Sequence, residues 1–253
     1  MSRRIILAGL AALLALAFSA FSASGASAAE AVTCVEAPTT AEAEFKDPHC
    51  VEPGHTAAGP NYKHVAFGST PTQLTLHSAS EFQFLKAELF GTAVTLRGTG
   101  VECIDCMAEN SGGVVKGSGG QLRYTGVEVV GHAGCTVVDD ENATGSGKGT
   151  ADQITTTPLK FETTGTSTAV IKPVNPPVLA HINITNVGGC PGALTRTVNV
   201  EGEVNGTTSG ATLKVETGAG ELEIEEEPAF LEGEATMTAG ETGSTTHHPV
   251  ALT

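Results

Sequence analysis

The chain has 253 residues, a net charge of −15 at pH 7, six cysteines and no tryptophan. So negative a chain repels nucleic acid and anionic membrane surfaces, and we therefore expect neither as a partner. The charge suits a soluble extracellular protein, or one that attracts cations.

The first 28 residues have the pattern of a secretory signal peptide. Arg3 and Arg4 form a short positive segment, an apolar run follows over 5–21, and Ala26-Ser27-Ala28 is a small-residue cleavage site. The arginine pair also resembles a twin-arginine signal, but the strongly apolar run favours the general secretory route. A membrane anchor would need a longer apolar run without the small-residue exit. No second apolar run and no lipidation motif follow, so we expect the mature chain to be exported and held to the surface, if at all, by noncovalent contacts.

The remaining chain divides into an N-terminal segment and a long β-rich region. Residues 29–60 are poor in apolar periodicity and rich in proline, which predicts an irregular segment stapled by a disulfide. Residues 61–253 alternate apolar and polar positions between glycines, the signature of half-buried antiparallel strands. The clearest runs are 73–77, 92–97, 197–201, 211–216 and 221–225.

The predicted fold is an all-β, disulfide-stapled antiparallel β-sandwich or paired-sheet domain, which follows a cleaved signal peptide. A β-solenoid-like or two-lobed β architecture is the alternative. The proline-rich stretch 173–177 is either a linker between two lobes or a crossover loop, and the loop is favoured because the strand pattern resumes at once. Residues 81–89 are the one place outside the signal where a helical turn is an alternative to a strand.

The even number of cysteines in an exported chain predicts disulfides. Cys34 and Cys50 bracket one short segment and are expected to pair. Cys103 and Cys106 form a C-x-x-C, but neither a thioredoxin-like βαβ pattern nor a second zinc-ligand pair accompanies it. We therefore expect both to be oxidised, with at least one of them bonded to Cys135 or Cys190. The disulfide candidates are Cys34, Cys50, Cys103, Cys106, Cys135 and Cys190.

The remaining motifs do not define a catalytic or metal site, and no cofactor is expected. Residues 145–150 resemble a phosphate-binding loop but lack its first glycine and its final Ser or Thr. The acidic tip 139–142 lacks the spacing of a calcium loop. His247-His248 is an adjacent pair near the terminus, and neither H-E-x-x-H nor G-x-S-x-G occurs.

Several motifs together resemble a group of secreted proteins of high-GC actinobacteria that has no assigned function. They comprise the signal, Cys34 with Phe45-x-Asp47-x-His49-Cys50, Gly134-Cys135, the run 154–160, and Cys190 followed by the alternating run 198–206. The resemblance implies export and a β-rich fold and supplies no active site.

The sequence thus predicts a secreted non-catalytic protein whose role it does not specify, with a structural, adhesive or surface-binding role as the candidates. It identifies no partner, and a cell-surface or extracellular polymer is the candidate. A secreted polysaccharide hydrolase with paired carboxylates is one alternative. A calcium-stabilised surface module is the other.

Overall fold

The computed structural model describes residues 31–47, 50, 52–69, 71–111, 114–139, 149–163, 167–209, 212–216, 221–240 and 248–252. Within these ranges the chain forms strands and no helix, and all strand pairs are antiparallel. The predicted all-β, antiparallel and disulfide-stapled class is confirmed. The predicted signal peptide, 1–28, lies outside the described residues.

The strands close into two rings of eight that share one long strand, β20 (Glu227–Gly240). We call them the proximal and distal rings, by their distance from the described chain ends. The proximal ring contains, in hydrogen-bonded order, β20, β3 (Thr72–Ser78), β7 (Met107–Ser111), β8 (Val114–Ser118), β13 (Leu159–Thr163), β14 (Thr168–Pro173), β17 (Val204–Ser209) and β18 (Thr212–Glu216). The distal ring contains β20, β4 (Gln83–Leu89), β5 (Thr92–Gly98), β10 (Glu128–Val129), β11 (Cys135–Asp139), β15 (Val178–Asn186), β16 (Arg196–Gly202) and β19 (Leu222–Ile224).

The register of β20 shows how both rings close on it. Ala235 lies opposite Ser78 of β3 on one side and Leu213 of β18 on the other. Nearer its start, Ala229 lies opposite Ala87 of β4 and Leu222 of β19. A strand paired on both sides has no free edge, and closing a sheet on itself is one way in which all-β folds avoid exposed edges.

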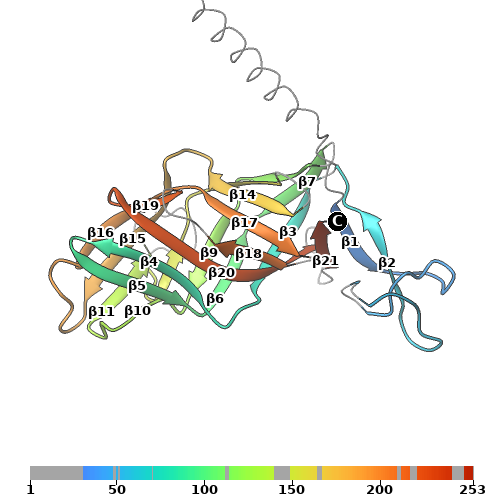
Figure 1. The fold of residues 1–253 in the computed structure, drawn as a ribbon, viewed down its shortest axis with the longest axis horizontal. Coiled ribbons are helices and arrows are strands. Elements are labelled where there is room, and N and C mark those ends of the chain that lie inside the picture. The colour runs from blue at the N-terminus through green and yellow to red at the C-terminus, as the bar shows by residue number, and fades with distance from the viewer. Residues whose placement is uncertain are drawn as a thin grey trace, which may run out of the picture.

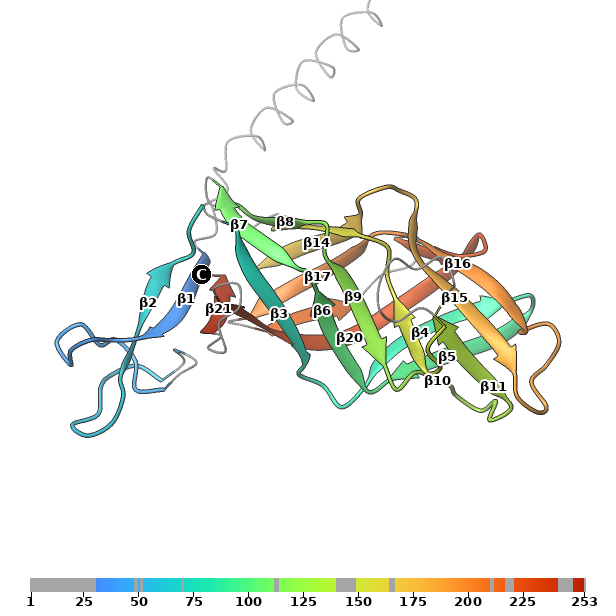
Figure 2. The ribbon, with the colours of Figure 1, turned by 180° about the vertical axis from the view of Figure 1, so that it is seen from behind.

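A separate three-stranded sheet lies across the two rings on the face away from β20. It consists of β6 (Gly100–Ile104), β9 (Gln121–Thr125) and β12 (Gln153–Thr155). Figure 1 shows β20 in front of this sheet, and Figure 2, from behind, shows β6 and β9 in front. Its β6 packs beside β3, and its β12 packs beside β11 and β15, so it covers the junction between the rings.

The two ends of the described chain meet at the proximal end of the elongated molecule (Figure 1). There β1 (Ala31–Glu36) pairs with β2 (Tyr62–Ala66) and with β21 (His248–Leu252), and β21 pairs with β20. The connection between β1 and β2 is largely irregular and carries the Cys34–Cys50 disulfide. The segment 29–60 is therefore not irregular throughout, because β1 finds two strand partners that lie far away in sequence.

The chain passes repeatedly from one ring to the other. It crosses from β3 to β4, from β14 to β15 and from β16 to β17, and it reaches the bridging sheet between other crossings. Residues 174–177 connect β14 to β15 and thereby cross from the proximal to the distal ring, and the Pro176-Pro177 peptide is cis. The helical alternative for 81–89 is wrong: cross-strand pairing with β5 and β20 makes Gln83–Leu89 a strand. Because each ring is assembled from several separate segments, neither can form from one continuous half of the chain.

Candidate functional site

The three disulfides pair neighbours in sequence order: Cys34 with Cys50, Cys103 with Cys106, and Cys135 with Cys190. The first pair confirms the prediction. The expectation that Cys103 or Cys106 bonds to Cys135 or Cys190 is wrong, although both are oxidised. The reason is topological, because Cys103 and Cys106 flank one tight turn from β6 to β7, whereas Cys135 starts β11 and lies beside the end of β15.

The disulfides differ in what they constrain. The chain-entropy model gives a bond that closes a short C-x-x-C loop about 2 kcal/mol of stabilisation. A bond between residues 55 apart, as in Cys135–Cys190, gains about 4 kcal/mol in the same model. Cys135–Cys190 is therefore the bond that ties together distant parts of the fold.

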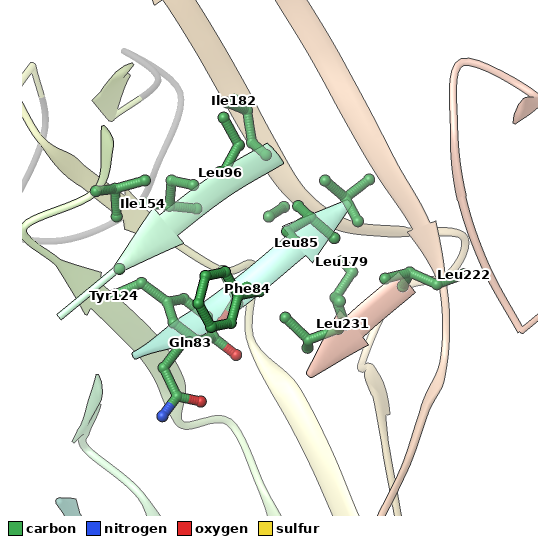
Figure 3. A pocket seen from close by; sticks show the side chains of 15 residues that line it. Gln83, Phe84, Leu85, Leu96, Tyr124, Ile154, Leu179, Ile182, Leu222 and Leu231 are labelled. Carbon is green, nitrogen blue, oxygen red and sulfur yellow. The ribbon is translucent and has the colours of Figure 1, made fainter. Parts of the chain in front are cut away.

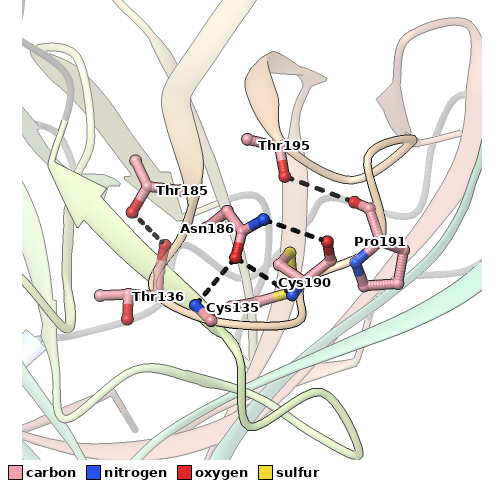
Figure 4. The surroundings of a disulfide bond; sticks show 8 residues. Cys135, Thr136, Thr185, Asn186, Cys190, Pro191 and Thr195 are labelled. Carbon is pink, nitrogen blue, oxygen red and sulfur yellow. Dashed lines mark hydrogen bonds between the residues drawn. A yellow bond between two sulfur atoms is a disulfide. The ribbon is translucent and has the colours of Figure 1, made fainter.

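A compact hydrogen-bond network surrounds Cys135–Cys190 (Figure 4). The Asn186 side-chain oxygen accepts from the backbone N–H of Gly188 at 2.8 Å and of Cys190 at 3.2 Å. The backbone N–H of Val187 donates to Gly134 O at 2.9 Å. A Cβ on Gly134 would overlap the Gly188 carbonyl, so the two loops approach each other backbone to backbone. The loop after β15 is thus fixed against the turn between β10 and β11.

These loops belong to the distal end of the molecule, which carries exposed apolar side chains. Phe90 in the β4–β5 turn is 48% exposed, Val130 in the β10–β11 turn 41%, and Val187 in the β15–β16 loop 66%. Both ribbon views place these three loops at the end opposite the terminal strands (Figures 1 and 2). The guanidinium of Arg196 lies 3.7 Å from the centre of the Phe90 ring, which holds that ring in place. We call Phe90, Val130, Val187 and Arg196 the distal patch.

Sequence reasoning did not find the distal patch, because its members lie in three unrelated loops. One signal was present: Phe90, Val130 and Val187 are each followed by glycine, and Gly91, Gly131 and Gly188 all have positive φ. An apolar residue beside a turn glycine is placed where the chain reverses at the surface.

The interior of the distal ring contains a small apolar cavity of about 50 Å³, shown in Figure 3. A cavity that holds benzene measures about 150 Å³, so this one is a packing gap within the core rather than a site for a sugar or lipid. Tyr124 and Gln83 are two of the residues that line it. Burial raises the pKa of the Tyr124 phenol to about 12. The other lining residues are Phe84, Leu85, Leu96, Gly98, Val127, Ile154, Thr156, Leu179, Ala180, Ile182, Val200, Leu222 and Leu231.

A row of side chains crosses five strands on the outer face of β10, β5, β4, β20 and β18. Neighbours in the row lie directly opposite each other in the sheet register, in the order Glu128, Arg97, Phe84, Glu232 and Glu216. Glu232 Oε2 lies 2.8 Å from Lys86 Nζ, and Glu216 Oε2 lies 3.3 Å from Lys214 Nζ. The Glu216 and Glu232 end of the row borders a hollow of about 340 Å³ that Phe82 and Phe84 also line.

The carboxylate of Asp139 is buried, 1% exposed, and points away from solvent. It accepts hydrogen bonds from Thr155 N at 2.9 Å, Thr155 Oγ1 at 2.6 Å and Gln153 Nε2 at 2.8 Å. These contacts tie β11 to β12 and use Asp139 as a structural acceptor. The rest of the predicted acidic tip, 140–142, lies outside the described residues, as do 145–148 of the phosphate-loop-like segment.

The histidines of the described ranges are spread over separate elements. The His64 ring centre lies 4.5 Å from that of Phe45, and His181 Nδ1 lies 2.8 Å from Asn199 Oδ1. Over the described part of the chain, no three His, Cys, Asp or Glu side chains gather as they would around a metal ion. Of the pair His247-His248, the first residue and the side chain of the second lie outside the described part.

No helix in the described ranges is long and apolar enough to cross a membrane. Comparison with known proteins yields no matching family model, no matching curated protein and no matching solved structure.

Proposed function

We propose that the protein is an extracellular, non-catalytic binding protein that attaches to a cell-surface or extracellular polymer through its distal patch. The observation that carries the proposal is the gathering of Phe90, Val130 and Val187, exposed, on three loops at one end of the molecule. Apolar side chains that are exposed on rigid loops at one end of a protein offer area that a partner can cover without ordering a loop.

Two structural features support the rigidity. The Cys135–Cys190 disulfide and the Asn186 contacts fix the loop that bears Val187 against the neighbouring turn. Arg196 covers one face of Phe90 and presents a cation beside it. The partner surface that suits such a patch is apolar with nearby acceptor or anionic groups, since Arg196 can donate hydrogen bonds at its rim.

The test is retention of the purified mature protein on the producer's insoluble cell-wall fraction and on a glycan panel, with released sugars assayed in parallel. We expect Phe90→Asp and Val187→Asp each to weaken retention by about tenfold or more, because each places a charge where apolar contact is made. Val65→Asp is the matched control, since Val65 is 41% exposed in β2 at the opposite end. Equal loss in all three variants, or unchanged retention in the first two, would contradict the role of the distal patch.

The hydrolase alternative has one specific observation in its favour. Glu216 and Glu232 are cross-strand neighbours, whose Cβ atoms in such pairs lie about 5 Å apart. They border a hollow that two phenylalanine rings line. A glycosidase uses two such carboxylates, one as the acid that protonates the leaving oxygen. Here each carboxylate is exposed and forms an ion pair with a lysine, Glu232 with Lys86 and Glu216 with Lys214. Sugar release by the wild type that Glu232→Gln abolishes would establish this alternative in place of binding.

The calcium alternative remains a prediction. The one described carboxylate of the acidic tip, Asp139, is already occupied by three protein donors. A melting temperature that chelator leaves unchanged would remove this alternative.

A further inference from the structure

Most lysine and arginine side chains of the described residues have a partner for their charge. Arg196 lies over the Phe90 ring, and seven others each form an ion pair with a glutamate: Lys46, Lys63, Lys86, Arg97, Lys116, Arg123 and Lys214. Among the described lysines and arginines, only Lys160 and Lys172 take part in neither kind of contact. Two unpaired cations are unexpected in a chain with 28 acidic residues against 13 basic ones.

These two lysines lie directly opposite each other in the proximal ring. Lys160 of β13 is in register with Lys172 of β14 on one side and with Ser118 of β8 on the other. Residues directly opposite in antiparallel strands have their Cβ atoms about 5 Å apart, and like charges at that spacing destabilise a sheet. The fold therefore holds two ammonium groups together against their mutual repulsion.

The neighbouring carboxylates do not offset this repulsion. Glu162 follows on the same face of β13, but its register partner in β8 is Lys116, which also forms an ion pair with Glu109. Glu203, just before β17, is exposed and forms no ion pair with Lys172. An anion from solution is thus the partner that the pair lacks.

The donors around this position suit a phosphate group. Lys160 and Ser118 are exposed and line a surface hollow of about 330 Å³, and the half-buried Lys172 stands beside Lys160. Two ammonium groups and a hydroxyl can all donate hydrogen bonds to an anion with several acceptor oxygens. Lysine binds phosphate as a point charge, whereas a planar carboxylate is matched better by the fork of an arginine.

We propose that Ser118, Lys160 and Lys172 form a binding site for one phosphate group. The group is free inorganic phosphate or a phosphate monoester carried by a larger molecule such as a sugar. A single group fits because Glu109 and Glu162 line the same hollow and repel the further charges of a polyanion. The inference goes beyond the proposed binding function and does not depend on it, since the site lies on the proximal ring and the distal patch at the other end.

The first test compares the melting temperature of the full mature chain in sodium phosphate and in sodium chloride of equal ionic strength, so that charge screening is the same. At about tenfold excess of phosphate over its dissociation constant, we expect the rise in the wild type to exceed that in Lys160→Gln/Lys172→Gln by about 2–4 °C. Lys86→Gln/Lys214→Gln is the matched control, because it removes two lysines that are ion-paired with glutamate and keeps any general stabilisation by phosphate. Equal rises in the wild type and both variants would overturn the proposal.

The second test locates the bound group by acylation of lysine amines with and without phosphate, followed by mass spectrometry of each lysine. We expect phosphate to slow the acylation of Lys160 and Lys172 by about threefold or more once most sites are occupied, and to leave Lys86 and Lys214 unchanged. Uniform slowing at all four lysines, or none at Lys160 and Lys172, would contradict the site.

Further ligands in the melting experiment distinguish the sources of the phosphate. A larger rise with a hexose phosphate than with inorganic phosphate at the same concentration assigns the monoester of a larger molecule, and the reverse assigns free phosphate. A single-stranded oligonucleotide is expected to give no rise that depends on Lys160 and Lys172. A rise as large as that with hexose phosphate would overturn a site for a single group.

Discussion

At the scale of single residues, the most informative side chain is Asp139. A buried carboxylate is costly unless its oxygens are hydrogen-bonded, and here three donors from β12 satisfy them. The acidic run that raised the calcium hypothesis thus begins with a residue that serves the junction between the distal ring and the bridging sheet.

Asp139→Asn is expected to lower the free energy of unfolding by about 2–4 kcal/mol. The amide keeps the shape of the side chain but turns one acceptor into a donor that faces other donors. Asp152→Asn is the control, since Asp152 is exposed with φ 58° and Asn tolerates that conformation. Urea unfolding of the two variants measures the difference. Similar stability of both would show that Asp139 contributes nothing through its hydrogen bonds.

Tyr124 makes the stability of the protein depend on alkaline pH. Burial raises its pKa from 10.0 to about 12, so the unfolded chain loses this proton first as the pH rises. The stabilisation is fully present below pH 10 and is lost between pH 10 and 12, at up to about 1.4 kcal/mol per pH unit.

The titration can be followed directly because the chain has only two tyrosines and no tryptophan. We expect tyrosinate absorbance with a midpoint near pH 12 in the wild type and in Tyr62→Phe, and its absence in Tyr124→Phe. Tyr124→Phe should also lose less stability between pH 10 and 12 than the wild type. An unchanged alkaline midpoint in Tyr124→Phe would assign the shift to another group.

At the scale of elements, the junction of β4 and β20 depends on a glycine. Gln83 of β4 is buried, and its side-chain amide donates to Ser80 Oγ at 2.9 Å and to Glu234 O at 3.0 Å. This amide occupies the space next to Gly233 of β20, where a Cβ would overlap it. The absence of a side chain at 233 is what lets Gln83 tie the two strands together.

Gly233→Ala is therefore expected to cost about 1–3 kcal/mol of stability, because the new methyl group must displace Gln83 from its hydrogen bonds. In a Gln83→Ala background the same substitution should cost much less, and the two variants form a double-mutant cycle. Gly192→Ala, with open space around it and no positive φ, is the neutral control. Additive costs in the cycle would mean that Gln83 and Gly233 are not coupled.

At the scale of the whole molecule, β20 makes the two rings one folding unit. It pairs with four ring strands, and the chain crosses between rings several times before β20 is reached. Neither ring is closed until the C-terminal region is in place. We therefore expect one cooperative unfolding transition, with the amides of β20 among the slowest to exchange hydrogen.

Ala229→Asp tests this coupling, since Ala229 is fully buried in β20 within the distal ring. An unpaired buried charge should cost about 3–5 kcal/mol and reduce the protection of both rings against hydrogen exchange. Cys34→Ser/Cys50→Ser is the contrast, because it should reduce protection in β1 and β2 alone. Loss of protection in the distal ring with the proximal ring unchanged would show two independent units.

The sequence by itself determined the class of the fold. Alternating runs such as 73–77 and 92–97 are strands because a period of two places one face in the core, and that pattern is local. The Cys34–Cys50 pair was also predictable, since the two residues bracket one short segment.

Only the tertiary structure decided ring closure, the other disulfides and the distal patch. The pairing of β20 with β3 joins residues more than 150 positions apart. The sequence of either strand alone does not determine which residues of the two strands lie opposite each other. The same holds for Cys135 and Cys190, which come close enough to bond because β11 pairs with β15. The turns that bear Phe90, Val130 and Val187 reach the same end of the molecule for this reason too, because each turn is local but the ring that brings the turns together is not.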